Sequence, residues 1–211
     1  MNSLMVFDEH VAEYDEWYEK YPEVFKSEVE ALRDMLPEGE ALSGIEVGLG
    51  TGQFAKALGI KEGIEPSPNM RAVAISRGIE VMDAVAESLP YKDLKFDFVL
   101  MSFCISYFKE LHSPFKEAHR VLKNNGALVI GFLDKNSVIG RAYAEHQADS
   151  IFYKHAKFYS VNKVVSELTQ AGFRNITIAQ TLFDPLDKIK TFQPSRKGYG
   201  EGSFVVLKAL K

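Results

Sequence analysis

The chain has 211 residues, of which 46% are hydrophobic and 12% aromatic, a composition that suits one packed α/β domain and excludes a disordered chain. Its net charge of −4 gives no general attraction to phosphate backbones, which argues against a dedicated nucleic-acid binder. The single cysteine, Cys104, excludes an intrachain disulfide framework and a cysteine metal cluster, and we expect no metal. Because the sequence has neither a basic, apolar leader nor a run of membrane-spanning length, we expect a cytoplasmic protein without a membrane partner.

Residues 1–40 are acidic and aromatic, and their apolar positions predict two helices. Tyr14 and Trp17 belong to an aromatic stripe at helical spacing, which Pro22 interrupts. A second amphipathic helix should end at the proline that precedes Gly39. Core packing explains such a stripe, and so does a lid over a bound ligand.

A strand, a glycine turn and a helix follow one another in the stretch that organises the chain. Gly48, Gly50 and Gly52 alternate with other residues, so the backbone can adopt positive φ and run close to a ligand. Dinucleotide enzymes use the spacing G-x-G-x-x-G here, with the pyrophosphate at the start of the helix. This chain has G-x-G-x-G, preceded by Glu46, whose charge would repel a pyrophosphate and suits a ligand with an ammonium or sulfonium group.

The next expected strand ends in an acid, Glu65. Its distance from the glycine turn is close to the spacing at which doubly wound folds place a carboxylate against ribose hydroxyls. A carboxylate accepts hydrogen bonds from both hydroxyls and would repel a 2′-phosphate. The turn and the acid together indicate a cofactor that contains a nucleoside. Ser67 and Pro68 then open a helix as its N-cap and first-turn residues.

Strands and helices alternate through the chain, which predicts a doubly wound sheet with helices on both faces. The expected strands are 44–47, 63–65, 80–83, 96–102, 127–132, 173–181 and 203–209, and the expected helices between them include 53–58, 68–77, 114–126 and 161–172. Met101 and Ser102 end an apolar strand that suits the centre of a parallel sheet. Because ligands bind beyond the carboxyl ends of such strands, these residues and Tyr107 should border the bound molecules.

The segment 133–160 mixes basic and aromatic side chains, among them Arg141 and His155. Platforms for nucleic acid use this mixture, and a lid over a small polar acceptor would use it too. The acidic balance of the whole chain favours the lid or ordinary packing. Cys104 could be a thiolate nucleophile, but no basic or proline neighbour supports that role, and we expect a buried, inert thiol.

In their order, these motifs resemble the class I S-adenosylmethionine (SAM)-dependent methyltransferases of the small-molecule, UbiE-like or methyltransferase-11-like type. Residues 46–52 (EVGLGTG) match the acid-x-Gly-x-Gly-x-Gly motif, and residues 85–91 (VAESLPY) resemble acid-Ala-Glu-x-Leu-Pro-Phe. Residues 117–126 (EAHRVLKNNG) resemble Glu-x-x-Arg-Val-Leu-Lys-Pro-Gly-Gly, and residues 14–18 (YDEWY) are similar to the entry helix that folds over the cofactor. The resemblance spans roughly residues 10–180.

The resemblance implies an α/β, Rossmann-like domain whose mostly parallel, seven-stranded sheet has an antiparallel last strand. We expect residues 1–211 to form this single methyltransferase domain. Its parts would be an N-terminal helical lid (1–40), a cofactor-binding core (41–132), an insert or acceptor lid (133–160) and the C-terminal part of the sheet (161–211).

The implied reaction moves a methyl group from SAM to a small-molecule acceptor by direct displacement. The expected cofactor-binding residues are Tyr14, Glu46, Gly48, Gly50, Gly52, Glu65, Pro66, Met70, Ala86, Glu87, Met101 and Ser102. The expected acceptor-pocket residues are Trp17, Tyr107 and Arg141. Many relatives hold the adenine amino group with an aspartate where this chain has Val85, so the Ala86 N–H and Glu87 would replace that contact. A general base is optional, and His146, His155 and Tyr107 are the candidates that could assist an amine acceptor.

Three other functions remain open at the level of sequence. A nicotinamide-dependent oxidoreductase could use the same fold, but Gln53 stands where its motif needs glycine, and Glu46 opposes it. A non-catalytic SAM-binding regulator would retain the same binding motifs. A nucleic-acid methyltransferase would be supported by salt-dependent RNA or DNA binding through Lys154 and Lys157. The sequence does not determine the acceptor, its attacking atom or the oligomeric state.

Overall fold

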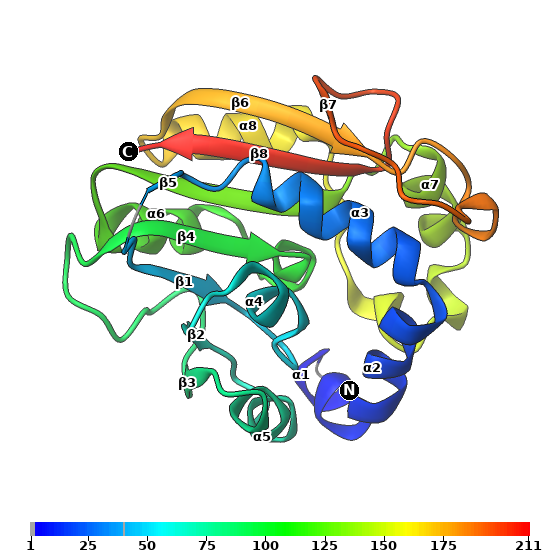
Figure 1. Cartoon of the computed structure of the whole chain (residues 1–211), viewed down its shortest axis with the longest axis horizontal. Coiled ribbons are helices and arrows are strands. Elements are labelled where there is room, and N and C mark those ends of the chain that lie inside the picture. Colours follow the sequence, from blue (N-terminus) through cyan, green and yellow to red (C-terminus); the bar gives the residue numbers. More distant parts are fainter. Residues whose placement is uncertain (1–2, 40) are drawn as a thin grey trace.

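The computed structural model describes residues 3–39 and 41–211, and one eight-stranded sheet forms its centre (Figure 1). The strands are β1 (Gly44–Val47), β2 (Glu62–Ile64), β3 (Glu80–Met82), β4 (Phe96–Ser102), β5 (Leu122–Leu133), β6 (Arg174–Thr181), β7 (Arg196–Lys197) and β8 (Phe204–Leu210). The helices are α1 (Ser3–Glu9), α2 (Val11–Lys20), α3 (Pro22–Arg33), α4 (Gln53–Leu58), α5 (Pro68–Ser76), α6 (His112–Val121), α7 (Val138–Glu145) and α8 (Val161–Gln170). No helix in this described part is long and apolar enough to cross a bilayer.

The strands lie in the order β3-β2-β1-β4-β5-β8-β6-β7. The first five of these are parallel, and β8 enters antiparallel between β5 and β6. From β1 the chain runs outward through β2 and β3 and then returns to β4 on the other side of β1. In sheets of this kind the ligand crevice lies beyond the carboxyl ends of the strands at that reversal.

The doubly wound α/β fold with an antiparallel last strand is confirmed, and two details differ from the expectation. The sheet has an eighth strand, β7, whose two residues are too few to give a periodic signal. Helix α6 ends at Val121 rather than at Gly126, because Leu122 already pairs with Phe96 as the start of β5. Asn125 takes the left-handed conformation expected for this turn, with φ of 63°.

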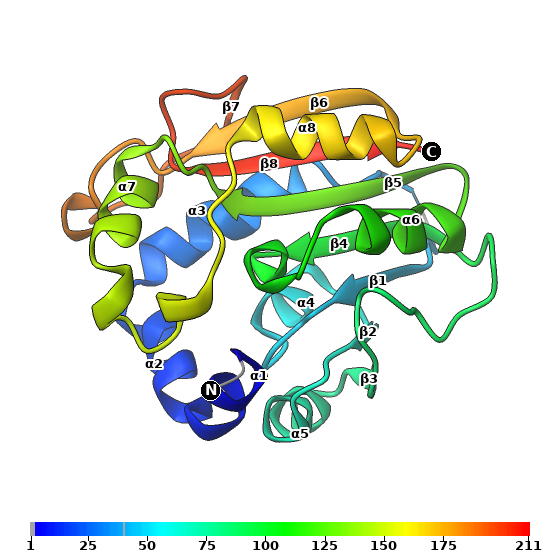
Figure 2. The same cartoon turned by 180° about the vertical axis from the view of Figure 1, so that it is seen from behind.

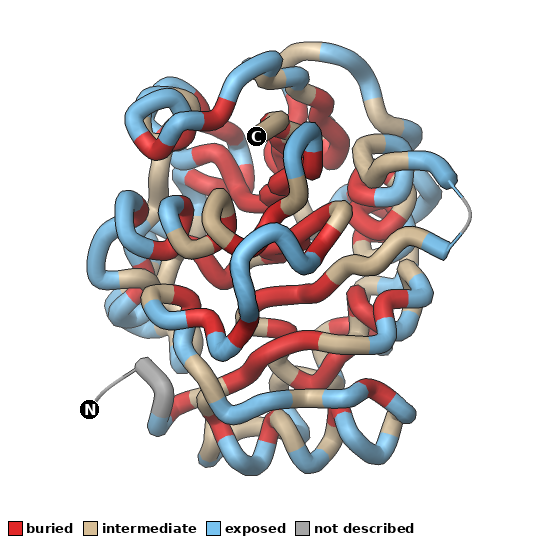
Figure 3. The backbone as a smooth tube through the Cα atoms, turned by 90° about the vertical axis from the view of Figure 1, so that its left-hand side faces the viewer, coloured by how far each residue is buried: buried red, intermediate tan, exposed pale blue. Residues whose placement is uncertain are grey.

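Two apolar clusters cover the two faces of the sheet. The helices α6 and α8 pack on one face, through side chains such as Phe115 and Leu168. The helices α3, α4 and α5 supply side chains such as Leu32 and Phe54 to the cluster on the other face, as the two opposite views show (Figures 1 and 2). Because both faces are covered, the central strands are buried along nearly their whole length (Figure 3).

The N-terminal segment forms three helices where two were expected. His10 separates α1 from α2, and Pro22 begins α3 as its first helical residue. Helix α3 ends at Arg33, before the predicted boundary. Figure 1 shows α1 and α2 near the carboxyl end of β1, with α1 beside α5, so they lie over the predicted crevice.

Candidate active site

The glycine turn after β1 adopts the backbone that its sequence predicts. Gly48 and Gly50 have φ of 68° and 56°, values that side-chain-bearing residues rarely adopt. A Cβ on Gly48 would lie 2.7 Å from the Cβ of Cys104, and a Cβ on Gly50 would lie 3.3 Å from the hydroxyl of Tyr14. Gly48 therefore permits close packing against Cys104, and Gly50 keeps open the space between the turn and α2.

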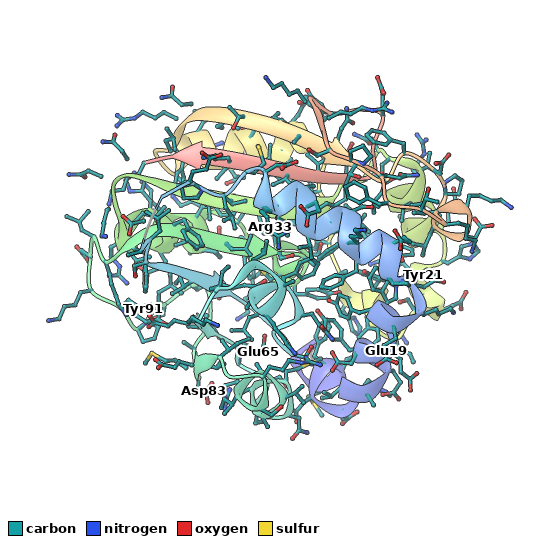
Figure 4. The ribbon with its side chains drawn as sticks, viewed as in Figure 1. Glu19, Tyr21, Arg33, Glu65, Asp83 and Tyr91 are labelled. Carbon is teal, nitrogen blue, oxygen red and sulfur yellow. The ribbon has the colours of Figure 1, made fainter. Side chains whose placement is uncertain are left out.

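Glu65 is held rigidly at the end of β2 and is 7% exposed (Figure 4). Its Oε2 accepts a hydrogen bond from the Gly50 N–H at 2.9 Å, and its Oε1 accepts one from the Ser67 N–H at 2.9 Å. Burial raises the pKa of the carboxyl, and these two backbone hydrogen bonds oppose the rise. Each oxygen keeps a further lone pair, so the group can accept hydrogen bonds from ligand hydroxyls.

Glu46 is a second buried acid, located beneath the turn rather than on a cavity wall. It is 1% exposed, and its Oε2 has no hydrogen-bond partner within residues 3–39 and 41–211. Burial raises the pKa of this carboxyl well above its ordinary range, and the nearby charge of Glu65 adds to the rise. A positively charged ligand group above the turn would offset this unfavourable burial.

A cavity of about 720 Å³ lies over the turn and continues beneath the N-terminal helices. Eleven of the fifteen predicted site residues line it: Tyr14, Trp17, Gly48, Gly50, Glu65, Pro66, Met70, Ala86, Glu87, Ser102 and Tyr107. The exposed Val85 lines it too, beside Ala86. Segments far apart in the sequence thus enclose one space at the switch point of the sheet.

Four predicted site residues do not line the cavity. Glu46 lies below the turn, and Gly52 packs against Ile79. Met101 is fully buried in the core on the α6 face, because successive strand residues point to opposite faces. Arg141 is exposed on α7, whose buried face is instead formed by residues such as Ile139.

Two aspartates tie the N-terminal helices to the edge of the cavity, and both were missed as functional candidates in the sequence. Asp15 of α2 accepts a hydrogen bond from the Thr51 hydroxyl at 2.6 Å and pairs with the guanidinium of Arg77. Asp8 of α1 accepts hydrogen bonds from the Ser67 hydroxyl at 2.7 Å and from the Asn69 N–H at 2.9 Å. These contacts hold α1 and α2 across the cavity.

Aromatic rings from α1, α2 and two later segments of the chain form part of the cavity wall. The rings of Phe7 and Tyr107 meet edge to face with centroids 4.8 Å apart, and Phe7 stacks on Phe152 at 5.5 Å. Tyr14 approaches Phe152 edge to face at 5.9 Å. Phe7 and Phe152 were not predicted as site residues, since only the tertiary fold brings α1 and the 133–160 segment together.

The phenols of Tyr14 and Tyr107 on this wall are neutral. Burial raises the pKa of the Tyr14 and Tyr107 phenols, so they stay protonated and cannot act as bases at neutral pH. Burial also raises the pKa of the Cys104 thiol, which confirms the expected burial and disfavours the reactive thiolate. The Ser102 hydroxyl lines the cavity without a hydrogen-bond partner in the described part of the chain, so it is free to contact a ligand.

The comparisons with known proteins point to one family. Residues 45–130 match the family described as a methyltransferase domain. An uncharacterised protein of Methanocaldococcus jannaschii is 41% identical over 208 residues, covering 99% of this chain and all of that protein. A crystal structure from Thermotoga maritima, described as a SAM-dependent methyltransferase and possible histamine N-methyltransferase, has a TM-score of 0.95 and 38% identity, with both chains fully covered.

The chain belongs to the class I SAM-dependent methyltransferases, and its cofactor is S-adenosylmethionine. The residues present fit that molecule, since the Glu46 oxygen lacks a partner among the described residues and the Gly50 side of the turn is open. A Haloferax volcanii methyltransferase, solved in complex with the methyltransferase activator Trm112, has a TM-score of 0.71 at 16% identity and covers 97% of this chain and 96% of its own. That likeness shows the shared fold.

Proposed function

We propose that this SAM-dependent methyltransferase acts on a small-molecule acceptor bound in the aromatic half of the cavity. The observation that carries the proposal is the shape of the site. One cavity extends from the glycine turn to the wall of Phe7, Tyr107 and Phe152, and α1 and α2 cover it. Its volume of about 720 Å³ falls within the range of roughly 300–1,000 Å³ that is typical of small-molecule sites.

The half of the cavity next to Glu65 would hold the cofactor. Glu65 would accept the ribose hydroxyls, and the buried carboxyl of Glu46 would balance the positive charge of the amino acid end. Met70 and the Ala86 backbone would border the adenine, with Glu87 near its amino group. When bound, SAM supplies a methyl group on an electrophilic sulfonium.

The protein's own part would be orientation and the exclusion of water. Residues 1–40 would act as the lid, held by Asp8 and Asp15, and residues 133–160 would close the acceptor side. Because the phenols of the wall remain protonated, we assign no general base to them. Fixed geometry can supply much of the rate of a displacement when the reacting atoms are held close together.

The test begins with calorimetry of the purified protein with SAM, S-adenosylhomocysteine and NAD. We expect binding of the two adenosyl sulfur compounds and none of NAD. Formation of S-adenosylhomocysteine is then measured against a library of amines, phenols, thiols and acids, and against total RNA and DNA. Turnover that depends on a small molecule supports the proposal. Turnover with nucleic acid alone, or with no compound at all, overturns it in favour of a nucleic-acid methyltransferase or a SAM-binding regulator.

A further inference from the structure

Glu28 of α3 is a buried acid that has no role in the site described above. It is 1% exposed, and its Oε2 has no hydrogen-bond partner among the described residues. Glu65, by contrast, accepts two backbone hydrogen bonds. Burial alone raises the pKa of the Glu28 carboxyl well above its ordinary range. A buried carboxyl without a partner weakens the folded state, so α3 would be more stable with an apolar residue at this position.

Glu28 lines a small second cavity, together with three aromatic and five aliphatic side chains. This cavity measures about 10 Å³, close to the smallest volume that can hold one water molecule. Trp17, Tyr143 and Tyr153 line it, and Tyr143 stacks on Tyr153 with ring centroids 4.7 Å apart. Aliphatic side chains from α3, β5, α7 and the segment after β6 form the remaining walls. We call this space the Glu28 chamber.

The Glu28 chamber adjoins the acceptor half of the main cavity. Trp17 and Tyr153 line both spaces, so one layer of aromatic side chains separates the carboxyl from the acceptor. Trp17 and Tyr153 are half-buried, and a ligand that extended from one space into the other would require these side chains to change rotamer. Both cartoon views place the beginning of α3 next to α2, and Glu28 lies near the middle of α3 (Figures 1 and 2).

The chemistry of the chamber selects for a cation. A carboxyl that loses its proton in an apolar space needs a positive partner, and aromatic faces attract the same kind of group. A neutral polar ligand would leave the charged form of Glu28 uncompensated, and an anion would be repelled by it. An organic ammonium group, with an apolar chain that reaches back between Trp17 and Tyr153, satisfies both the acid and the rings.

We propose that the methyl acceptor carries a protonated amine and that Glu28, within its aromatic walls, is the residue that selects it. This inference rests on the proposed small-molecule activity and deepens it by naming the class of acceptor. Glu28 holds the charged end of the acceptor and takes no part in the methyl displacement. It is therefore a specificity residue rather than a catalytic one.

The experiment measures binding to the protein loaded with S-adenosylhomocysteine. The probes are 2-phenylethylamine and a series of alkyl monoamines and diamines, each compared with the neutral alcohol of the same shape. The wild type should bind the amines at least about tenfold more tightly than the alcohols, because a charge-assisted contact is lost in the alcohols. Glu28→Gln should remove that preference while the affinity for S-adenosylhomocysteine stays unchanged.

The matched control is Glu23→Gln, which removes a half-buried acid from the first turn of the same helix and should keep the preference for amines. For acceptors that turn over, Glu28→Gln should raise KM about 10- to 100-fold with little change in kcat. If Glu28 mainly stabilised the fold, Glu28→Gln would lower the Tm. We expect instead that the Tm of Glu28→Gln equals or exceeds that of the wild type.

Three results would overturn the inference. They are equal binding of amines and alcohols by the wild type, an amine preference that survives Glu28→Gln, and failure of every amine to bind. If Glu28→Gln does not fold, the comparison of amine and alcohol binding by the wild type still tests whether the site prefers a cation. Turnover of neutral small molecules alongside any of these results would leave the proposed function intact, whereas the absence of small-molecule turnover would remove both proposals.

Discussion

Replacement of Gly50 by alanine separates the backbone role of the glycine turn from its role in binding. The φ of 56° at this residue is costly for any residue with a Cβ, by about 1–2 kcal/mol, and the stiffer unfolded chain returns part of that cost. We therefore expect Gly50→Ala to lower the free energy of unfolding by about 1 kcal/mol. For a chain of this size, that corresponds to a fall in Tm of about 2–4 °C.

The binding effect of Gly50→Ala follows from what its Cβ would meet. The new methyl group would lie 3.3 Å from the Tyr14 hydroxyl, inside the space between turn and lid, so that Tyr14 must move. That movement strains the hydrogen bond that Tyr14 accepts from the Tyr18 hydroxyl at 2.8 Å, a contact worth about 1 kcal/mol. With the added crowding of the cofactor space, we expect SAM to bind about tenfold more weakly, which corresponds to about 1.4 kcal/mol.

Gly59→Ala is the matched control, because Gly59 has φ of 76° and nothing lies within 4 Å of the position that its Cβ would take. It should lose a similar stability and keep the wild-type affinity for SAM. Circular dichroism melts and titration calorimetry of the two variants measure both quantities. Equal SAM affinity in Gly50→Ala, Gly59→Ala and the wild type would refute the assignment of this turn to the cofactor.

Three further predictions address the lid, the Glu28 chamber and the adenine end of the cavity. Asp15→Asn should lower the free energy of unfolding by about 1–2 kcal/mol and weaken SAM binding, while the exposed neighbour Glu16→Gln changes neither by calorimetry. The raised pKa of Glu28 means that the folded state holds its proton more tightly than the unfolded chain. The contribution of this group to the free energy of unfolding is therefore complete below the ordinary Glu pKa of 4.5 and falls as the pH rises above it. Glu28→Gln should flatten this decline when denaturant titrations are compared from pH 4 to 7. An unchanged dependence of stability on pH would contradict the burial of the acid. Val85→Asp should strengthen SAM binding several-fold by offering an acceptor to the adenine amino group. Substitution of the similarly exposed Val138, which lies outside the cavity lining, by aspartate should leave the affinity unchanged.

The parts of the site that the sequence determined are those set by short stretches of chain. Strand, glycine turn and helix follow one another from Gly44 to Leu58 as predicted, because positive φ at glycine and apolar periodicity are local properties. Ser67 caps α5, and Glu65 meets the Gly50 N–H, since one short β-α-β unit fixes the spacing between turn and acid. These local rules were sufficient to indicate the fold and the cofactor.

The tertiary structure alone decided which distant side chains share the cavity. Arg141 and Phe152 belong to the same basic and aromatic segment, yet only Phe152 reaches the cavity, because the path of the chain after α7 turns it toward Phe7. Asp15 holds the lid because it forms an ion pair with Arg77. Glu28 is a candidate specificity residue because it lines the same small cavity as Trp17, Tyr143 and Tyr153. Helical periodicity tells which face of α2 or α3 is buried, but the identity of the partner depends on long-range packing, which no local pattern encodes.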